Sequence, residues 1–306
     1  MSVLTQPSRN ASNNVDGLYG CSEAGIVVLS FSIRHFDASR RQSSFGTDFS
    51  DEGPRFWIDL NSSTHMGHRE LFPGHFINFT TNKDARHWLG GTQSCEGAWC
   101  SNCRLPLMLH LTLDCSDQVL NLDGMPCRTL KLFYCMRCAL SWYDFCYRIV
   151  SENQIEIIEE FRGETAWEEW YSEGGVDVLE RRSLQLSPIP PRLQDLYDRL
   201  NANEDLTESE EAEVASFTGD YANPDVGAYP IVDVINQLGG RSFLCQRLDD
   251  PVCSGCKRAG FEPQTMYFLA SLTNDAKAGV RITFDGYQIV YFLCPTCGTI
   301  KVQHSV

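Results

Sequence analysis

Cys100-Ser101-Asn102-Cys103 is followed after 31 residues by Cys135-Met136-Arg137-Cys138, and this spacing is the strongest structural signal in the 306-residue chain. The arrangement returns as Cys253-Ser254-Gly255-Cys256 and, after 37 residues, Cys294-Pro295-Thr296-Cys297. Two cysteines separated by two residues can face one ion from a tight turn, and two such turns complete a tetrahedron of sulfurs. The spacing predicts two zinc sites, with the ligands Cys100, Cys103, Cys135 and Cys138 in the first and Cys253, Cys256, Cys294 and Cys297 in the second.

The residues around the cysteines repeat as well. Leu89-Gly90-Gly91 precedes the first set and Leu238-Gly239-Gly240 the second, and each last cysteine pair follows an aromatic-rich run, TLKLFYC at 129–135 and YQIVYFLC at 287–294. A motif repeated with its flanks indicates an internal duplication. The alternative, disulfides or redox dithiols, is less consistent with this ribbon-like spacing in a chain without an evident export signal.

Four thiolates leave no open coordination position for water, so such sites are structural rather than catalytic. Zinc binding contributes about 10–16 kcal/mol in small zinc peptides, comparable with the stability of a whole domain. The chain contains no HExxH, paired-carboxylate or phosphate-loop signature. We therefore expect a protein that is not an enzyme and whose cofactors are two structural Zn²⁺ ions.

Composition is ordinary for a globular chain, with 42% hydrophobic and 11% aromatic residues. The first 18 residues lack the apolar run of a signal peptide and are expected to form a flexible leader. No stretch approaches the ~18 apolar residues of a membrane helix. These features predict a cytoplasmic protein with reduced thiols.

Charge is distributed unevenly. The chain carries 40 acidic and 25 basic residues, and its net charge of −15 resides in residues 151–230, which hold 20 acidic and 5 basic residues. Each filled tetrathiolate site would add two further negative charges. Such a field repels nucleic-acid phosphates and favours a basic partner.

The fold class predicted is α+β, predominantly β, with two related β units joined by an acidic helical segment. We expect an N-terminal unit at 19–150, a connecting segment at 151–230 and a C-terminal unit at 231–306. Alternating or continuous apolar runs predict strands. These strands are 25–33, 55–60, 107–113 and 130–134 in the first unit and 266–272, 280–284, 287–293 and 299–303 in the second, with a hairpin turn at Asp285-Gly286.

The connecting segment contains two helix signals. Pro191 suits the first turn of a helix ending near residue 200. Thr207-Glu208-Ser209-Glu210 has the spacing of a capping box, which predicts a second helix ending near Phe217.

Six side chains of this segment are candidates for partner binding: Trp167, Trp170, Glu208, Glu210, Glu211 and Glu213. The two tryptophans share a face if the chain is helical there, so they either pack in the core or anchor a partner. The glutamates either form a solvated helix face or dock a basic protein.

Two other groups of residues are weaker candidates. His65, His68 and His75 lie in a loop-like segment without helical spacing, which does not favour a metal site. The six cysteines outside the two quartets are expected to be small buried apolar residues. They are Cys21, Cys95, Cys115, Cys127, Cys146 and Cys245.

The order of these motifs resembles a known family. The resemblance lies in the order of four features: His87-Trp88-Leu89-Gly90-Gly91, the first cysteine pair, the strand at 106–111 and Leu132-Phe133-Tyr134-Cys135. In that order the chain resembles the programmed cell death protein 2 family and the bacterial YwqG-like family. The resemblance covers residues 87–150 and 236–303. It implies two related β units and a binding role, since the eukaryotic members are chaperones for a basic ribosomal protein.

Together these observations predict a zinc-stabilised interaction module that binds a basic protein in the manner of a chaperone or an inhibitor. Two alternatives stay open. A nucleic-acid-binding zinc ribbon would need a locally basic face, and an enzyme with an unusual site would need a reactive thiol or an incompletely ligated metal.

Overall fold

The computed structural model describes residues 71–92, 94–122, 124–138, 145–159, 167–201, 204–218, 236–244, 248, 251–275, 278–284 and 287–305. The expected leader, the strands expected at 25–33 and 55–60 and the turn at 285–286 lie outside these ranges. Among the helices that are described, none is long and apolar enough to cross a membrane.

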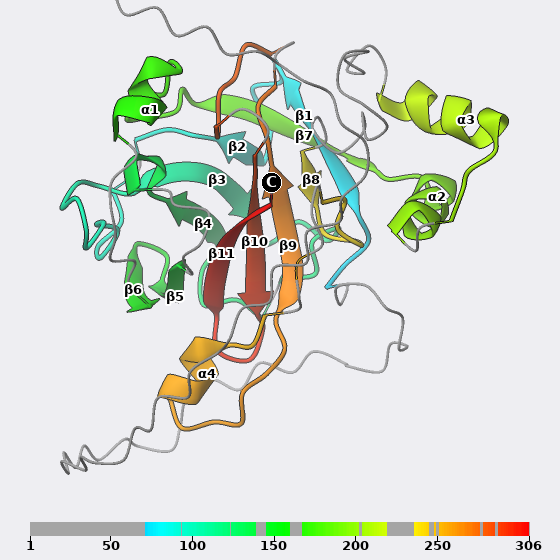
Figure 1. Ribbon diagram of the computed structural model, residues 1–306. Helices are drawn as coiled ribbons and strands as arrows, with labels where there is room; N and C mark the ends of the chain where they lie inside the picture. The colour runs from blue at the N-terminus through cyan, green and yellow to red at the C-terminus, as the bar shows by residue number, and fades with distance from the viewer. Residues whose placement is uncertain are drawn as a thin grey trace, which may run out of the picture. The chain divides into compact units, whose positions relative to one another are not determined.

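The described part of the chain is predominantly β (Figure 1). Its eleven strands form one antiparallel sheet in the order β4-β3-β2-β7-β1-β8-β9-β10-β11-β5-β6. The strands are β1 His75–Thr80, β2 His87–Leu89, β3 Met108–Asp114, β4 Thr129–Tyr134, β5 Phe145–Ser151, β6 Gln154–Glu159, β7 Arg182–Pro188, β8 Gln237–Leu238, β9 Tyr267–Leu272, β10 Gln288–Cys294 and β11 Thr299–Ser305. The helices are α1 Trp167–Ser172, α2 Pro191–Asn201, α3 Glu208–Thr218, α4 Ser254–Arg258 and the 3₁₀ turn η1 Met136–Cys138.

Strands β3, β4, β9, β10 and β11 fall where the apolar runs predict them. Every residue of β10 is buried, which agrees with a continuous run of apolar and aromatic residues covered on both faces. The strand expected at 280–284 does not form. Instead, the Asn274 side-chain oxygen accepts hydrogen bonds from the backbone N–H groups of Ile282 (2.8 Å) and Thr283 (2.9 Å), which holds this stretch in a loop.

The two cysteine-bearing units are built alike. Strands β2, β3 and β4 pair in the same order as β8, β9 and β10. Both β3–β4 and β9–β10 carry an irregularity in register, after Leu109 and after Phe268 respectively. The expected duplication is therefore present in the strand pairing as well as in the sequence.

The two Leu-Gly-Gly turns make equivalent hydrogen bonds. Gly91 N–H donates to the carbonyl oxygen of Leu179, just before β7, and Gly240 N–H donates to that of Phe72, just before β1. Leu89 pairs with Arg182 at the start of β7, as Leu238 pairs with His75 at the start of β1. An approximate twofold axis therefore passes between the central strands β1 and β7.

The acidic segment 151–230 contributes to the sheet. Its strand β7 lies between β2 and β1, and its strand β6 forms one edge. The two cysteine-bearing units therefore share a continuous sheet in the described residues, rather than being joined by a purely helical connector. Helices α2 and α3 pack together around Leu193, Leu196 and Val214.

The sheet curls so that strands distant in its order face one another. Tyr291 of β10 and His110 of β3 share a buried hydrogen bond of 2.6 Å. His110 and His304 are buried among aromatic rings, and Nε2 of each has no hydrogen-bond partner among the described residues. Burial lowers the pKa of His110 to about 3 and that of His304 to about 4.

The edge strand β4 is closed by side chains. Phe133 N–H donates to the hydroxyl of Tyr147 in β5 (2.9 Å), and Thr129 N–H donates to the carboxylate of Glu152 (3.0 Å). These contacts satisfy backbone groups that an open edge would offer to another chain. The curled sheet is thereby sealed between β4 and β5 without a regular strand pairing.

A pair of glycine substitutions tests the Leu-Gly-Gly turn. Gly90 and Gly279 both have φ of +63°, but a Cβ on Gly90 would lie 2.5 Å from the Leu179 carbonyl oxygen, whereas one on Gly279 would meet nothing within 4 Å. We expect Gly279→Ala to cost about 1 kcal/mol from backbone strain and Gly90→Ala about 2 kcal/mol more, measured by urea unfolding. Equal losses in the two variants would contradict this account of the turn.

The buried histidines predict a loss of stability in acid. Both stay neutral in the folded chain but take up a proton near pH 6.5 when unfolded, so stability falls as the pH drops from 6.5 toward 4, by about 1.4 kcal/mol per pH unit for each histidine. The double variant His110→Leu/Tyr291→Phe should lose less stability between pH 7 and pH 5 than Tyr291→Phe, which keeps the imidazole. Chemical unfolding at the two pH values measures this difference, and identical losses would show that His110 does not contribute.

Candidate metal centres

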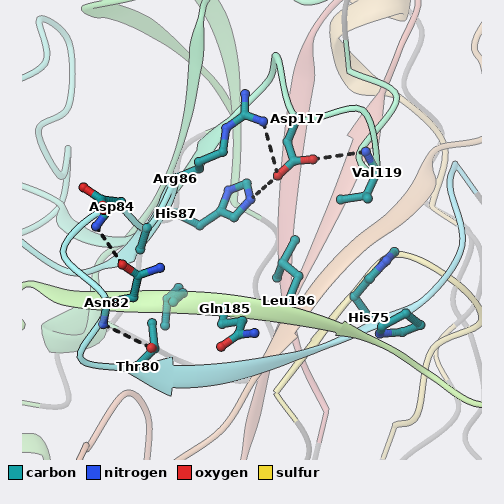
Figure 2. A pocket seen from close by; sticks show the side chains of 13 residues that line it. His75, Thr80, Asn82, Asp84, Arg86, His87, Asp117, Val119, Gln185 and Leu186 are labelled. Atoms are coloured by element: carbon teal, nitrogen blue, oxygen red, sulfur yellow. Dashed lines mark hydrogen bonds and ion pairs between the residues drawn. The ribbon is translucent and has the colours of Figure 1, made fainter.

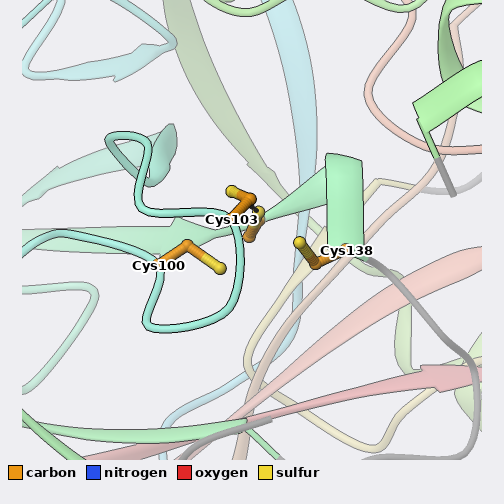
Figure 3. Close-up of side chains that lie close together, drawn as sticks. Cys100, Cys103 and Cys138 are labelled. Carbon is orange, nitrogen blue, oxygen red and sulfur yellow. Dashed lines mark hydrogen bonds between the residues drawn. The ribbon is translucent and has the colours of Figure 1, made fainter. Parts of the chain in front are cut away.

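The first cysteine quartet connects the loop before β3 with the end of β4. Cys100 and Cys103 lie in a tight turn, in which Cys100 N–H donates to the carbonyl oxygen of Leu105 (2.9 Å). Cys135 and Cys138 lie in and next to the 3₁₀ turn that follows β4. The turn and the strand end bring the two pairs together (Figure 3).

The second quartet has a different local structure. Cys253 caps the N-terminus of α4, and its sulfur accepts a hydrogen bond from Cys256 N–H at 3.3 Å. Cys294 ends β10, and its carbonyl oxygen accepts from Gly298 N–H (2.9 Å) in the turn that also presents Cys297. A short helix and a turn therefore present the two cysteine pairs of the second quartet, whereas two turns present those of the first.

The sulfur positions fit a tetrahedral metal. Within each quartet all four sulfurs lie within 4.8 Å of one another. Sulfurs of a tetrahedron with metal–sulfur bonds of about 2.3 Å are about 3.8 Å apart, whereas a disulfide bond is about 2.0 Å long. The sulfurs of Cys103 and Cys135 lie 3.7 Å apart, those of Cys253 and Cys297 3.4 Å apart and those of Cys256 and Cys294 3.6 Å apart. All described cysteines are free thiols.

In each quartet, hydrogen bonds among the thiols lower the pKa of one cysteine and raise that of another, but the lowered cysteine is the first of the first quartet and the last of the second. Bonds from neighbouring thiols lower the pKa of Cys100 to about 2 and that of Cys297 to about 2. The hydrogen bond to Cys100 raises the pKa of Cys135, and the bond to Cys253 raises that of Cys294.

A buried arginine distinguishes the first quartet. Arg137 lies between its last two cysteines, and its guanidinium donates to Asp177 (2.6 Å) and to the Pro106 carbonyl oxygen. Burial lowers the pKa of Arg137, but the hydrogen bond to Asp177 outweighs this effect and raises it. The guanidinium therefore offsets part of the negative charge of four thiolates.

The second quartet has no such cation in the equivalent position. Thr296 stands there and is exposed. Instead, the Thr299 hydroxyl lies 3.1 Å from the Cys297 sulfur. Groups of this kind, which contact ligands rather than the metal, commonly tune metal affinity. The two quartets should therefore differ in the strength with which they hold the same metal.

Trp170 is a core residue rather than a surface anchor. Its side chain is fully buried, its indole N–H donates to the Val176 carbonyl oxygen (3.1 Å), and its ring packs against Phe284. A partner cannot reach it in this fold. Trp167 begins α1, but its side chain lies outside the described residues.

The glutamates of α3 divide into two classes. The capping box is present, since Thr207 N–H donates to Glu210 (2.9 Å), and the Glu210 carboxylate also pairs with Arg192 and Arg199. Hydrogen bonds from Thr207 and the two arginines lower the pKa of Glu210 to about 2.

Glu213 lies near Arg192 (3.4 Å), whereas Glu208 and Glu211 are exposed and no ion pair to their carboxylates is found within the described residues. Of the four, only Glu208 and Glu211 therefore have carboxylates free for a partner.

Among the remaining cysteines, the thiols of Cys115 and Cys127 are hydrogen-bonded to one another. Cys115, Cys127 and Cys146 are buried, and Cys95 is partly buried. The residues Cys21, Cys245, His65 and His68 lie outside the described part of the chain. His75 lies in β1 and lines a cavity of about 400 Å³ (Figure 2).

A histidine–carboxylate pair in this cavity resembles a catalytic pair but is fully bonded. His87 Nε2 lies 3.0 Å from the Asp117 carboxylate, and His87 Nδ1 accepts from the Asp114 backbone N–H (3.2 Å). In the other unit the Asn236 side-chain oxygen accepts from Thr273 N–H in the equivalent place (2.9 Å). Because both ring nitrogens are occupied within the fold, His87 has none left to act as a general base.

Comparisons with known protein families, with curated proteins and with solved structures found no match to this chain. The resemblance in the order of motifs therefore stays a prediction, and the two cysteine quartets carry the functional argument.

The asymmetry between the quartets predicts a difference in metal release. Replacing Arg137 with glutamine removes the buried positive charge and should weaken the first site about tenfold while leaving the second unchanged. Native mass spectrometry across a chelator titration counts the ions lost at each concentration. Arg258→Gln, an exposed arginine beside the second quartet, is the control and should release both ions as the unaltered protein does. Unchanged release by Arg137→Gln would refute the role of the guanidinium.

Proposed function

We propose that the chain is a zinc-stabilised protein-interaction module that binds a basic protein partner and catalyses no reaction. The observation that supports the proposal is the pair of quartets, each with four sulfurs within 4.8 Å of one another, at the ends of two equivalent β-hairpins. Four sulfurs surround each ion position and leave no place for substrate or water, which favours a structural role.

Zinc is the metal that this donor set favours. Four thiolates in a tetrahedron suit zinc or iron–sulfur chemistry, and mononuclear Cys₄ sites between paired turns are typical of structural zinc. The ligands must lose protons to bind, so zinc affinity falls as the pH falls. The cytoplasm is the compartment that we propose, because it keeps thiols reduced.

Charge supports a basic protein as the partner. The segment 151–230 holds 20 acidic and 5 basic residues, and the carboxylates of Glu208 and Glu211 are exposed at the start of α3. The same field opposes nucleic-acid binding. The resemblance to chaperones of a basic ribosomal protein agrees with this partner class, and the binding would be chaperone-like or inhibitor-like.

A first experiment isolates the full chain gently from its own cells for native mass spectrometry. We expect two zinc ions per chain and a co-purified protein of high isoelectric point. Chains without metal would overturn the proposal at its base. Two zinc ions with a nucleic acid in place of a basic protein would favour the ribbon alternative.

A second experiment tests charge steering with the partner so identified. Glu208→Lys/Glu211→Lys should slow association about tenfold at low salt, with a smaller effect at high salt. Glu96→Lys/Glu262→Lys changes the total charge equally on other exposed positions and is the control. Equal association rates for the two variants would show that α3 is not the docking face.

A further inference from the structure

The cavity beside β1 and β7 has an apolar floor and an acidic wall. Leu184 and Leu186 of β7 line the cavity, and we call these two leucines its apolar floor. Asp84 and Asp117, here called its acidic wall, and His75 also line it; Figure 2 labels these three residues and Leu186. The segment that joins β3 to β4, which carries Asp117, covers one side. A volume of about 400 Å³ is large enough for a long side chain and a few waters.

The approximate twofold axis identifies what occupies the equivalent place in the other half. The residue equivalent to His75 is Arg182, because Leu238 pairs with His75 as Leu89 pairs with Arg182. The Arg182 guanidinium donates to the carbonyl oxygen of Ala278, in the segment that joins β9 to β10, and to Glu180 (3.0 Å). An internal arginine thus bridges the sheet and the loop in one half, whereas the shorter His75 leaves a cavity in the other.

The charges around the cavity suit a cation. Three carboxylates lie at or next to it, those of Asp84, Asp114 and Asp117, against one arginine, Arg86. The Arg86 guanidinium is engaged by Asp114 (3.0 Å), by Ser116 (2.8 Å) and, at 3.9 Å, by Asp117 (Figure 2), so this one arginine is shared between two of the three carboxylates. An acidic surplus therefore faces an apolar floor, an environment that suits the charged head and the methylene stem of an arginine.

We propose that this cavity receives an arginine side chain from the basic partner. The cavity would hold that arginine in the way that the other half of the sheet holds the Arg182 side chain, between a strand and a loop. This inference rests on the proposed function, since it names the part of a basic protein that the chain would recognise.

The test uses the zinc-loaded full chain and the peptide acetyl-Gly-Arg-Gly-amide, followed by ¹⁵N NMR titration. We expect millimolar, saturable shifts centred on His87 and Asp117, and at least about tenfold weaker binding of the citrulline peptide, which has the same shape without the charge. Equal binding of the two peptides, or shifts elsewhere, would overturn the proposal.

Two substitutions in the cavity lining test whether the peptide binds in the cavity. His75→Arg introduces the side chain that the other half carries and should abolish binding by filling the space, and Asp117→Asn should weaken it about tenfold. Glu262→Gln, an equal charge change at an exposed position outside the cavity lining, should have no effect. Full binding by a folded His75→Arg variant would refute the site.

The outcome is separable from that of the proposed function. If His75→Arg binds the purified basic partner as tightly as the unaltered chain does, the cavity proposal fails while the interaction module stands. If the arginine peptide binds but no basic protein co-purifies, the cavity is real and the partner class is wrong.

Discussion

The register of the two long hairpins depends on the four sulfurs that close each of them. Cys135 follows Tyr134, which pairs with Met108, and Cys294 follows Leu293, which pairs with Tyr267. Because side chains alternate between faces and both faces of these strands are buried, a slip of one residue would move the side chains of each face into the packing of the other and separate the thiols as well. Sulfur geometry and core packing therefore select the same register, and a bound metal would favour it further.

The two halves are most informative where they differ. His110 occupies the irregular position of β3 that Leu269 occupies in β9, Arg137 replaces an exposed threonine, and His75 replaces an arginine. At each of these positions one half of the scaffold carries a polar or charged group that the other half lacks or has in a different form, although the surrounding strands and turns are repeated. Since the scaffold does not require these differences, they are the positions at which metal affinity and partner recognition can be tuned separately in each half.

Sequence patterns predicted the local features well and the long-range ones poorly. The thiol quartets, β3, β9, β10 and the Thr207 capping box depend on neighbouring residues or on the rigid preferences of a metal, so they could be derived. The pairing of β7 with β1 joins residues about 100 positions apart, and neither strand has a distinctive pattern. The segment at 280–284 has strand-like composition, but one asparagine side chain caps its backbone and prevents pairing. Burial of Trp170 depends on Phe284, more than 100 residues away, which helical spacing alone cannot reveal.

The acidic excess acts in two ways that the fold separates. Part of the negative charge is neutralised within the fold, because Arg192 and Arg199 pair with Glu210 at the junction of α2 and α3. These ion pairs hold the two helices together. The remainder would act at a distance: with the basic partner that we propose, it would accelerate association but contribute little to how long the complex lasts. A partner held only by that field would dissociate quickly and be lost at moderate salt. A lasting complex therefore needs a contact that excludes water, and the cavity beside His75, with its apolar floor and acidic lining residues, is a place in the described fold that could offer one.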